Sequence, residues 1–345
     1  MKRFLKYCIL FSFPFVFMFV LYFIVDPFKV IKHYDNYYVK GDIVAVNRNY
    51  VSTMTYINQW RKYHYDSFIF GNSRSLFYYE KDWKKHIPAS SVVYHFSESG
   101  GSINGIYNKV KFIDDCGEKI NNALFVIDYG LLSSMEQDGI LYAMPPQINN
   151  NRNFIDFHLT YLKGWFNVKF LRACLDYKLF GKWKPYMRNL ITLGINYKYY
   201  NPINNEEQRY IQDSLISIGK YYDDEHLKPF ENARGVEESP PVLNDERIAK
   251  LIEMSAILKK HHTNYSIIIS PLYNQTKLNS KDVKTLNEIF GEKSVFDFSG
   301  VNDWTNDYHN YYENSHYLPS VASQIMDSIY SSTLPDIPAW PDKTK

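Results

Sequence analysis

The chain has 345 residues, with 39 Lys and Arg against 37 Asp and Glu, which gives a formal net charge of +2 at neutral pH. This balance argues against an extended nucleic-acid-binding surface, so nucleic acid is not an expected partner. The 3 cysteines form no C-x-x-C or Cys/His spacing in the sequence and therefore predict no zinc site. The length is enough for one large domain, or for one domain with an insertion.

An uncharged run from 7 to 25, rich in Phe, Val, Leu and Ile, opens the chain. Its length corresponds to roughly 28 Å of helix, close to the ~30 Å hydrocarbon core of a bilayer. The basic residues within 1–6 predict a short cytoplasmic tail, with residues 26–345 facing outward. A cleaved signal peptide is disfavoured, because the run is long and residues 24–27 offer no small-residue cleavage site. We therefore expect an uncleaved transmembrane anchor.

Two of the three cysteines lie outside this run. Cys8 is inside the predicted span, whereas Cys116 and Cys174 are expected to face an oxidising space, where they could pair. Two cysteines make no disulfide framework, so their pairing stays open.

The outward part divides by its pattern. We expect a juxtamembrane stem with some helix at 26–60 and a main domain made of 61–130 and 243–332. Between these blocks, the strand–helix alternation breaks down at 131–242, which predicts a partly helical insertion. Residues 333–345 are expected to form a tail.

Short apolar runs and helical patterns alternate within the main domain. The expected strands are 67–70, 91–96, 123–127, 265–271 and 294–298. The expected helices are 103–114, 245–262, 281–290 and 319–332. Strands that alternate with helices of this length indicate βαβ units. We therefore expect an α/β fold: a doubly wound, flavodoxin-like parallel sheet of about five strands.

Ser73 follows the first expected strand, in the segment Gly71-Asn72-Ser73-Arg74. Gly71 permits a tight turn, and a helix that starts after it would present backbone N–H groups at its N-terminus. Ser73 is therefore the candidate nucleophile. The alternative is that its hydroxyl only caps a helix.

His316 is the candidate general base, and Glu313 lies three residues before it. A serine, a histidine and an acid are the parts of an acyl-transfer site, in which the imidazole removes the hydroxyl proton and the acid orients the imidazole. The alternative is a structural or solvated histidine before the last helix.

Two further positions follow expected strands. Gly100 and Gly101 come after the second strand, and either could donate a backbone N–H to an oxyanion, with Ser73 N–H as the first donor. Asp128 follows the third strand; it could bind substrate, shape a turn or lie near the oxyanion. Ligands bind at the carboxyl ends of strands in such sheets, so we expect these residues and His316 to share one site.

The order of these pieces resembles the SGNH/GDSL hydrolase superfamily, and more narrowly its membrane-anchored bacterial branch found with exported-polysaccharide acylation and envelope modification. The likeness rests on 71–74, on Gly100-Gly101, on the strand that ends at Asp128, and on Glu313-x-x-His316-Tyr317-x-Pro319. It extends over about 65–130 and 243–332.

The resemblance implies a serine esterase or O-acyltransferase that acts on an envelope or exported polysaccharide, with acetyl as the expected acyl group. Ser73 would be the nucleophile, His316 the base, and Glu313 would stand where the family usually has Asp. Asn72 and Arg74 would belong to the oxyanion or substrate-binding residues. No metal or organic cofactor is implied. The expected location is the bacterial inner membrane, single-pass, with the main domain periplasmic or extracellular.

The sequence departs from the family at two points. The G-x-N-D block that supplies an oxyanion-hole Asn is not recognisable, since the third strand continues as 126–130. Asn72 or Asn104 would have to replace that donor. The acid is Glu rather than Asp, which leaves Asp303 and Asp307 as alternatives. A second hypothesis is therefore a catalytically inactive SGNH-like scaffold that binds glycan or a polysaccharide-assembly partner.

Overall fold

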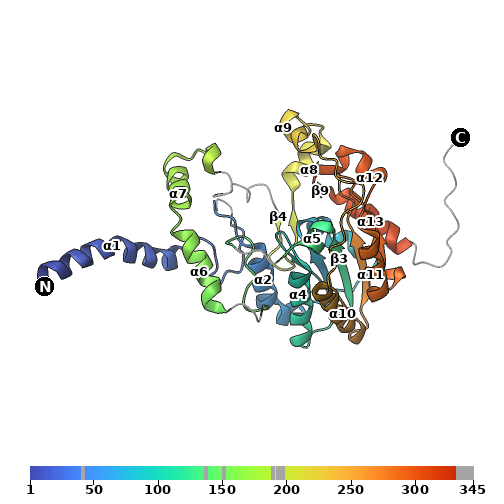
Figure 1. Cartoon of the computed structure of the whole chain (residues 1–345), viewed down its shortest axis with the longest axis horizontal. Helices are drawn as coiled ribbons and strands as arrows, with labels where there is room; N and C mark the ends of the chain where they lie inside the picture. The colour runs from blue at the N-terminus through green and yellow to red at the C-terminus, as the bar shows by residue number, and fades with distance from the viewer. Residues whose placement is uncertain (40–42, 136–138, 150–152, 188–190, 192–198, 332–345) are drawn as a thin grey trace. The chain divides into compact units, whose positions relative to one another are not determined.

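The computed structural model describes residues 1–39, 43–135, 139–149, 153–187, 191 and 199–331. The chain forms two compact units (Figure 1). The first consists of Met1–Arg61 and Glu136–Tyr210, and the second of Lys62–Met135 and Ile211–Lys345. The expected insertion at 131–242 is therefore divided between them, because its first residues, up to Met135, and its last part, from Ile211 onward, belong to the second unit.

The second unit contains a sheet of five parallel strands in the order β2-β1-β3-β6-β7. The strands are β1 (Ser67–Gly71), β2 (Val93–Ser97), β3 (Asn122–Ile127), β6 (Asn264–Ile269) and β7 (Val295–Asp297). Every residue of β1, β2 and β3 is buried, as expected for strands that are covered on both faces. The predicted α/β class and the parallel five-stranded sheet are confirmed.

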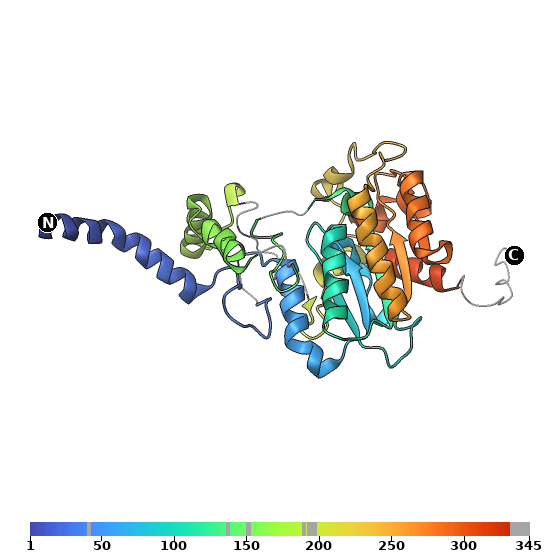
Figure 2. The ribbon, with the colours of Figure 1, turned by 60° about the horizontal axis from the view of Figure 1, so that its bottom comes forward.

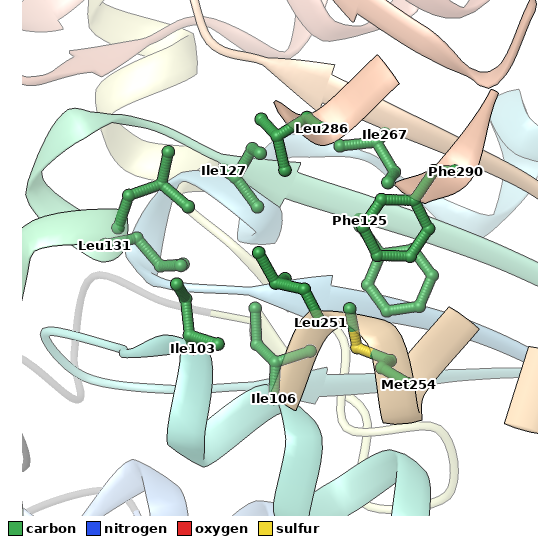
Figure 3. Close-up of a pocket in the computed structure, with 11 residues that line it drawn as sticks. Ile103, Ile106, Phe125, Ile127, Leu131, Leu251, Met254, Ile267, Leu286 and Phe290 are labelled. Atoms are coloured by element: carbon green, nitrogen blue, oxygen red, sulfur yellow. The ribbon is translucent and has the colours of Figure 1, made fainter. Parts of the chain in front are cut away.

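One face of the sheet is covered by α4 (Ile103–Asp115), α5 (Tyr129–Ser133), α10 (Asp245–Lys260) and α11 (Ser280–Phe290). Figure 2 shows α4 and α10 lying side by side across the strands. Apolar side chains from these helices meet Phe125 and Ile267 of the sheet (Figure 3). They enclose a void of only about 20 Å³, lined by carbon and sulfur atoms. This void is packing space rather than a ligand site.

The other face packs against α13 (Pro319–Ser331), α3 (Glu80–Trp83) and the 3₁₀ helix η1 (Ser73–Phe77). Val321, Ile325 and Ile329 recur at helical spacing on α13 and are buried, as their pattern predicts. The remaining short elements of this unit are α8 (Tyr210–Ser217), α9 (Asp224–Leu227), η4 (Lys228–Phe230), η5 (Glu292–Ser294), α12 (Asp303–Asn306) and η6 (Tyr308–Asn310).

His316 lies in a β-hairpin, which the expected strands did not include. Strand β8 (Tyr311–Glu313) pairs antiparallel with β9 (His316–Tyr317), and Glu313 is the partner of His316. Tyr311 and Tyr317 form the other pair and are buried in the core beneath. The hairpin pairs the backbone of these two residues, so that their polar groups can be hydrogen-bonded where the chain enters the core.

The first unit is mostly helical. Its elements are α1 (Lys2–Val25), α2 (Arg48–Tyr63), α6 (Phe154–Trp165), α7 (Val168–Phe180), η2 (Pro185–Met187), β4 (Tyr199–Tyr200) and β5 (Glu207–Gln208). Among the residues that the structure describes, one helix, Arg3–Val25, is long and apolar enough to cross a membrane. Cys116 and Cys174 belong to different units.

The segment after α1 is part of a folded core. Asp26 ends the helix in the left-handed region, and its buried carboxylate accepts the backbone N–H groups of Val30, Ile31 and Lys32. Tyr22 near the end of the helix is buried in the same apolar cluster as Phe28, Tyr37, Tyr50 and Trp165. Residues expected as a stem therefore contribute to the core of the first unit.

Candidate active site

Ser73 is the first residue of η1 and comes two residues after β1 ends. Gly71 has φ of 152°, and a Cβ there would lie 2.5 Å from the carbonyl oxygen of Val126, so a larger residue does not fit. Asn72 caps η1, since its Oδ1 accepts the Arg74 N–H at 3.0 Å. The turn that the sequence predicted around Ser73 is therefore tight and held by local contacts.

A continuous chain of hydrogen bonds runs from a carboxylate to this serine. Ser73 Oγ lies 2.7 Å from His316 Nε2, and His316 Nδ1 is bonded to Glu313 Oε1. With the Nδ1 proton directed at the carboxylate, Nε2 is free to accept the Ser73 hydroxyl proton. The structure thus brings the three candidate residues together in the order that nucleophilic acyl transfer requires.

Ser315 completes the carboxylate's environment, and the sequence analysis did not single it out. Its backbone N–H and its Oγ donate to Glu313 Oε2 at 2.9 and 2.7 Å. Burial alone would raise the pKa of Glu313, but the hydrogen bonds from His316 and Ser315 outweigh it and lower this pKa to about 2. The carboxylate is therefore ionised at neutral pH. In the sequence, only the position of Ser315 next to His316 could have indicated that Ser315 belongs to this site.

The other two acids have different positions. The Asp307 side chain accepts the backbone N–H of His309 at 2.9 Å and also contacts the His309 ring. Asp303 lies in the first turn of α12. In the part of the chain that the structure describes, Glu313 is the acid of these three that is hydrogen-bonded to His316.

A second network lies next to the serine. Asp128 is 1% exposed, and its Oδ2 accepts hydrogen bonds from Asn72 Nδ2 at 2.7 Å and from Arg74 Nη1 at 2.8 Å. Its Oδ1 caps α5 through the Leu131 N–H at 3.1 Å. Arg74 Nε also donates to the carbonyl of Ser315 at 2.9 Å. Both ends of the Asn72 amide therefore bind within the protein, which supports a positioning role for Asn72, Arg74 and Asp128.

The glycine loop after β2 packs against the same turn. Gly100 and Gly101 both have positive φ, 74° and 56°. A Cβ on Gly101 would lie 2.8 Å from Asn72 Cβ and 3.4 Å from a methyl group of Leu131. Gly101 thus permits a close approach between the loop and the turn that carries Ser73.

Two charged residues that the sequence analysis did not consider lie behind this loop. Glu98 and Lys109 are almost fully buried, and their charged atoms lie 3.0 Å apart. Glu98 Oε2 accepts the Ser102 N–H at 3.3 Å, and Lys109 Nζ donates to the carbonyl of Ser97 at 3.1 Å. The pair joins the end of β2 to α4. In the sequence, only a lysine at a buried position of the expected helix could have indicated this ion pair.

A pocket of about 280 Å³ opens beside Asp128. Its lining includes Ser270 after β6, Ser239 and Asn274. The volume is close to the lower end of the roughly 300–1,000 Å³ that small-molecule sites span. The lining also contains apolar side chains, among them Ile269 at the end of β6.

Comparisons with known proteins give no family. No protein-family model matches the chain, and a search of the curated proteins finds no match. Among the described residues, no group of three or more His, Cys, Asp and Glu side chains could hold a metal ion. The geometry of the site is therefore what points to a function.

Proposed function

We propose that this chain is a membrane-anchored, SGNH-like serine esterase or O-acyltransferase. The observation that carries the proposal is the hydrogen-bonded chain Ser73–His316–Glu313, with 2.7 Å between Ser73 Oγ and His316 Nε2. The strand order supports it, because β2-β1-β3-β6-β7 corresponds to the 2-1-3-4-5 order of a doubly wound, flavodoxin-like sheet. Ligands in such sheets bind beyond the carboxyl ends of the strands, where Ser73 follows β1.

The proposed reaction follows from the three side chains. Ser73 Oγ attacks the ester carbonyl carbon while His316 Nε2 takes the hydroxyl proton. The tetrahedral intermediate collapses, His316 returns the proton to the leaving alcohol, and an acyl-serine remains. Water or a sugar hydroxyl then attacks this ester while His316 takes its proton. When the second tetrahedral intermediate collapses, His316 gives that proton to Ser73 Oγ as the acyl group leaves. Glu313 stabilises the imidazolium in both halves.

The oxyanion of the intermediate needs hydrogen-bond donors. The Ser73 N–H is at the first position of η1, where a helix has no internal acceptor for it. Gly101 packs against Asn72, which supports a backbone N–H of the Gly100-Gly101 loop as a second donor. No step in this scheme requires a metal or an organic cofactor.

The proposed substrate is an O-acylated envelope or exported polysaccharide, with acetyl as the proposed acyl group. A pocket of about 280 Å³ beside Asp128, lined by both polar and apolar side chains, supports binding of a sugar-sized group near the end of β3. The apolar helix Arg3–Val25 supports attachment to a bacterial inner membrane with an inside N-terminus. Burial of Tyr22 in the first unit's core supports an uncleaved helix, because removal of a signal peptide would open that core.

One observation favours the second hypothesis, an inactive scaffold that binds glycan or an assembly partner. The amide of Asn72, which could have replaced the family's Asn donor, is bonded to Asp128 and to the Arg74 N–H. Loss of one oxyanion donor costs about 2.7–4 kcal/mol of transition-state stabilisation. The scaffold hypothesis predicts a folded protein without an activated serine.

The test is labelling of the full-length protein in detergent with a fluorophosphonate serine probe. We expect labelling of the wild type, its loss in both Ser73→Ala and His316→Ala, and no change in Ser217→Ala. Ser217 is an exposed serine of the same unit and serves as the matched control. An unlabelled wild type with native circular dichroism would favour the scaffold. Labelling that persists in Ser73→Ala would contradict the proposed nucleophile.

A further inference from the structure

Helix α6 presents an apolar face on the side opposite to its buried one. Phe157, Tyr161 and Trp165 recur at a spacing of four and are buried in the core of the first unit. Ile155, Leu159 and Phe166 are exposed. A soluble helix of this kind would carry polar residues on its outer face, so this face is unusual for a surface in contact with water.

Helix α7 continues the same feature. Leu175 is 61% exposed and Leu179 is 74% exposed, and they lie one turn apart. Val168 and Phe180 at the ends of the helix are exposed as well, while Phe170 is buried. We call the exposed apolar side chains of these two helices and their ends the α6–α7 apolar face: Phe154, Ile155, Leu159, Phe166, Val168, Leu175, Leu179 and Phe180. Clustered exposed apolar side chains mark an interaction surface.

Contacts with α1 place Trp165 of α6 beside the last two turns of α1. Trp165 Nε1 donates to the Met18 carbonyl at 2.9 Å, and the rings of Trp165 and Tyr22 lie 6.2 Å apart. Met18 precedes the end of the span, Val25, by seven residues, which is about 10 Å along a helix. If α1 spans the bilayer, Trp165 therefore lies inside the leaflet at the Val25 end.

The charges on this segment match that placement. Residues 154–187 contain six basic residues and two acidic ones. The basic residues are Lys163, Lys169, Arg172, Lys178, Lys182 and Lys184. Basic helices with an apolar face are typical of segments that lie in a membrane interface, where long cationic side chains reach the phosphates.

A pocket of about 580 Å³ lies between α1 and α6. Phe19 and Phe23 line it from α1, and Ile155 and Leu159 line it from α6. These side chains lie in the last two turns of the span or on the α6–α7 apolar face. An apolar pocket at this depth suits a lipid acyl chain.

We propose that α6 and α7 form a second membrane attachment, seated in the leaflet at the Val25 end of the span. Lipid acyl chains cover the α6–α7 apolar face and fill the pocket beside Phe19 and Phe23. The inference goes beyond the proposed catalysis and rests on α1 as a membrane span. It implies that the first unit is partly inserted in the membrane and is not only a flexible connection to α1.

The test uses full-length protein in phosphatidylcholine vesicles that contain about 20% phosphatidylglycerol. The phosphatidylglycerol supplies the anionic surface that basic helices bind. Cys8, Cys116 and Cys174 are replaced, and single cysteines at Leu175 or Leu179 carry an environment-sensitive fluorophore. Quenching is measured with iodide in water and with phosphatidylcholine that bears a nitroxide on its acyl chain. Retained fluorophosphonate labelling or native circular dichroism verifies the fold.

Two reference positions make the outcomes separable. Val16, in the middle of α1, reports on the span, and Ile252, which is 52% exposed on α10 of the other unit, reports on a water-facing apolar site. We expect the Leu175 and Leu179 probes to behave like the Val16 probe. The acyl-chain nitroxide should quench them, and iodide should quench them several-fold less than it quenches the Ile252 probe. Iodide access equal to that at Ile252 would overturn the proposal while leaving the span intact.

The remaining outcomes also decide. Protection of Leu175 and Leu179 from both quenchers would mean that protein covers the face, as in association with a second copy, and would overturn the proposal. Iodide access at Val16 would overturn the span and the second attachment together. The proposed catalysis is independent of all these results, because it is tested by probe labelling at Ser73.

Discussion

Arg74 Nε donates a hydrogen bond of 2.9 Å to the backbone carbonyl of Ser315, although 241 residues separate the two in the chain. Arg74 follows the proposed nucleophile, and Ser315 precedes the proposed base. The same guanidinium also binds the buried carboxylate of Asp128. This one side chain therefore joins the turn after β1, the end of β3 and the β8–β9 hairpin.

Arg74→Gln should destabilise the second unit and slow labelling of Ser73. The change removes the cation beside Asp128, which is 1% exposed, and a buried pair broken on one side costs about 3–5 kcal/mol. Arg74→Lys keeps the charge, but a lysine lacks the planar guanidinium that donates to both Asp128 and the Ser315 carbonyl. This variant should therefore show slower labelling with a smaller loss of unfolding free energy than Arg74→Gln. Urea denaturation and probe kinetics measure the two effects. An unchanged free energy of unfolding in Arg74→Gln would contradict this role.

Glu313→Gln should slow fluorophosphonate labelling by roughly 10²–10⁴-fold, the range in which general acid–base catalysis contributes. A glutamine cannot stabilise the imidazolium that forms when His316 takes the Ser73 proton. Asp307→Asn is the matched control, because Asp307 contacts His309 and should leave the labelling rate near that of the wild type. The opposite pattern, with Asp307→Asn impaired and Glu313→Gln active, would make Asp307 the acid.

The stability of the second unit should depend on acid through Glu313. The pKa of Glu313 is about 2 in the folded protein against 4.5 as its ordinary value. Because the folded pKa is the lower one, the ionised carboxylate contributes stability above pH 4.5, and this contribution is lost as the pH falls towards 2. Urea denaturation of the wild type and Glu313→Gln should show a constant difference at neutral pH that shrinks across this window. A difference independent of pH would show that the carboxylate is not held as described.

Gly101→Ala should disturb the turn that carries Ser73. The new methyl group would lie 2.8 Å from Asn72 Cβ, and overpacking of this kind costs about 1–3 kcal/mol. Gly117→Ala is the matched control, because Gly117 also has positive φ but no atom lies within 4 Å of a Cβ there. We expect a larger loss of unfolding free energy in Gly101→Ala and slower probe labelling in that variant alone. Equal effects in the two variants would mean that only backbone strain matters.

The sheet could be predicted because its strands have a local signature. Ile69, Leu124 and Ile268 belong to runs that are apolar on both faces, and the helices between them show their own periodicity. Such patterns depend on residues a few positions apart. The predicted parallel sheet is therefore observed, with strand ends that shift by one or two residues.

The division into units could not be predicted in the same way. Residues after Ile211 have short helical patterns that fit either core. In the structure, Tyr221 and Tyr222 donate to the carbonyls of Tyr312 and Tyr311, at 3.1 and 2.9 Å, which attaches this part to the β8–β9 hairpin. Only packing with residues about ninety positions away assigns it to the second unit.

The sequence by itself determined the apolar N-terminal helix, the α/β class and the position of Ser73 directly after the first strand, but not the β8–β9 hairpin that holds Glu313 and His316. Only the tertiary structure decided that Ser73 Oγ and His316 Nε2 lie 2.7 Å apart, and that the Asp128 carboxylate accepts hydrogen bonds from Asn72 and Arg74. The physical reason is the range of the interactions. Strand and helix patterns arise from neighbours along the chain, whereas these side-chain bonds join segments that only the packed sheet brings together.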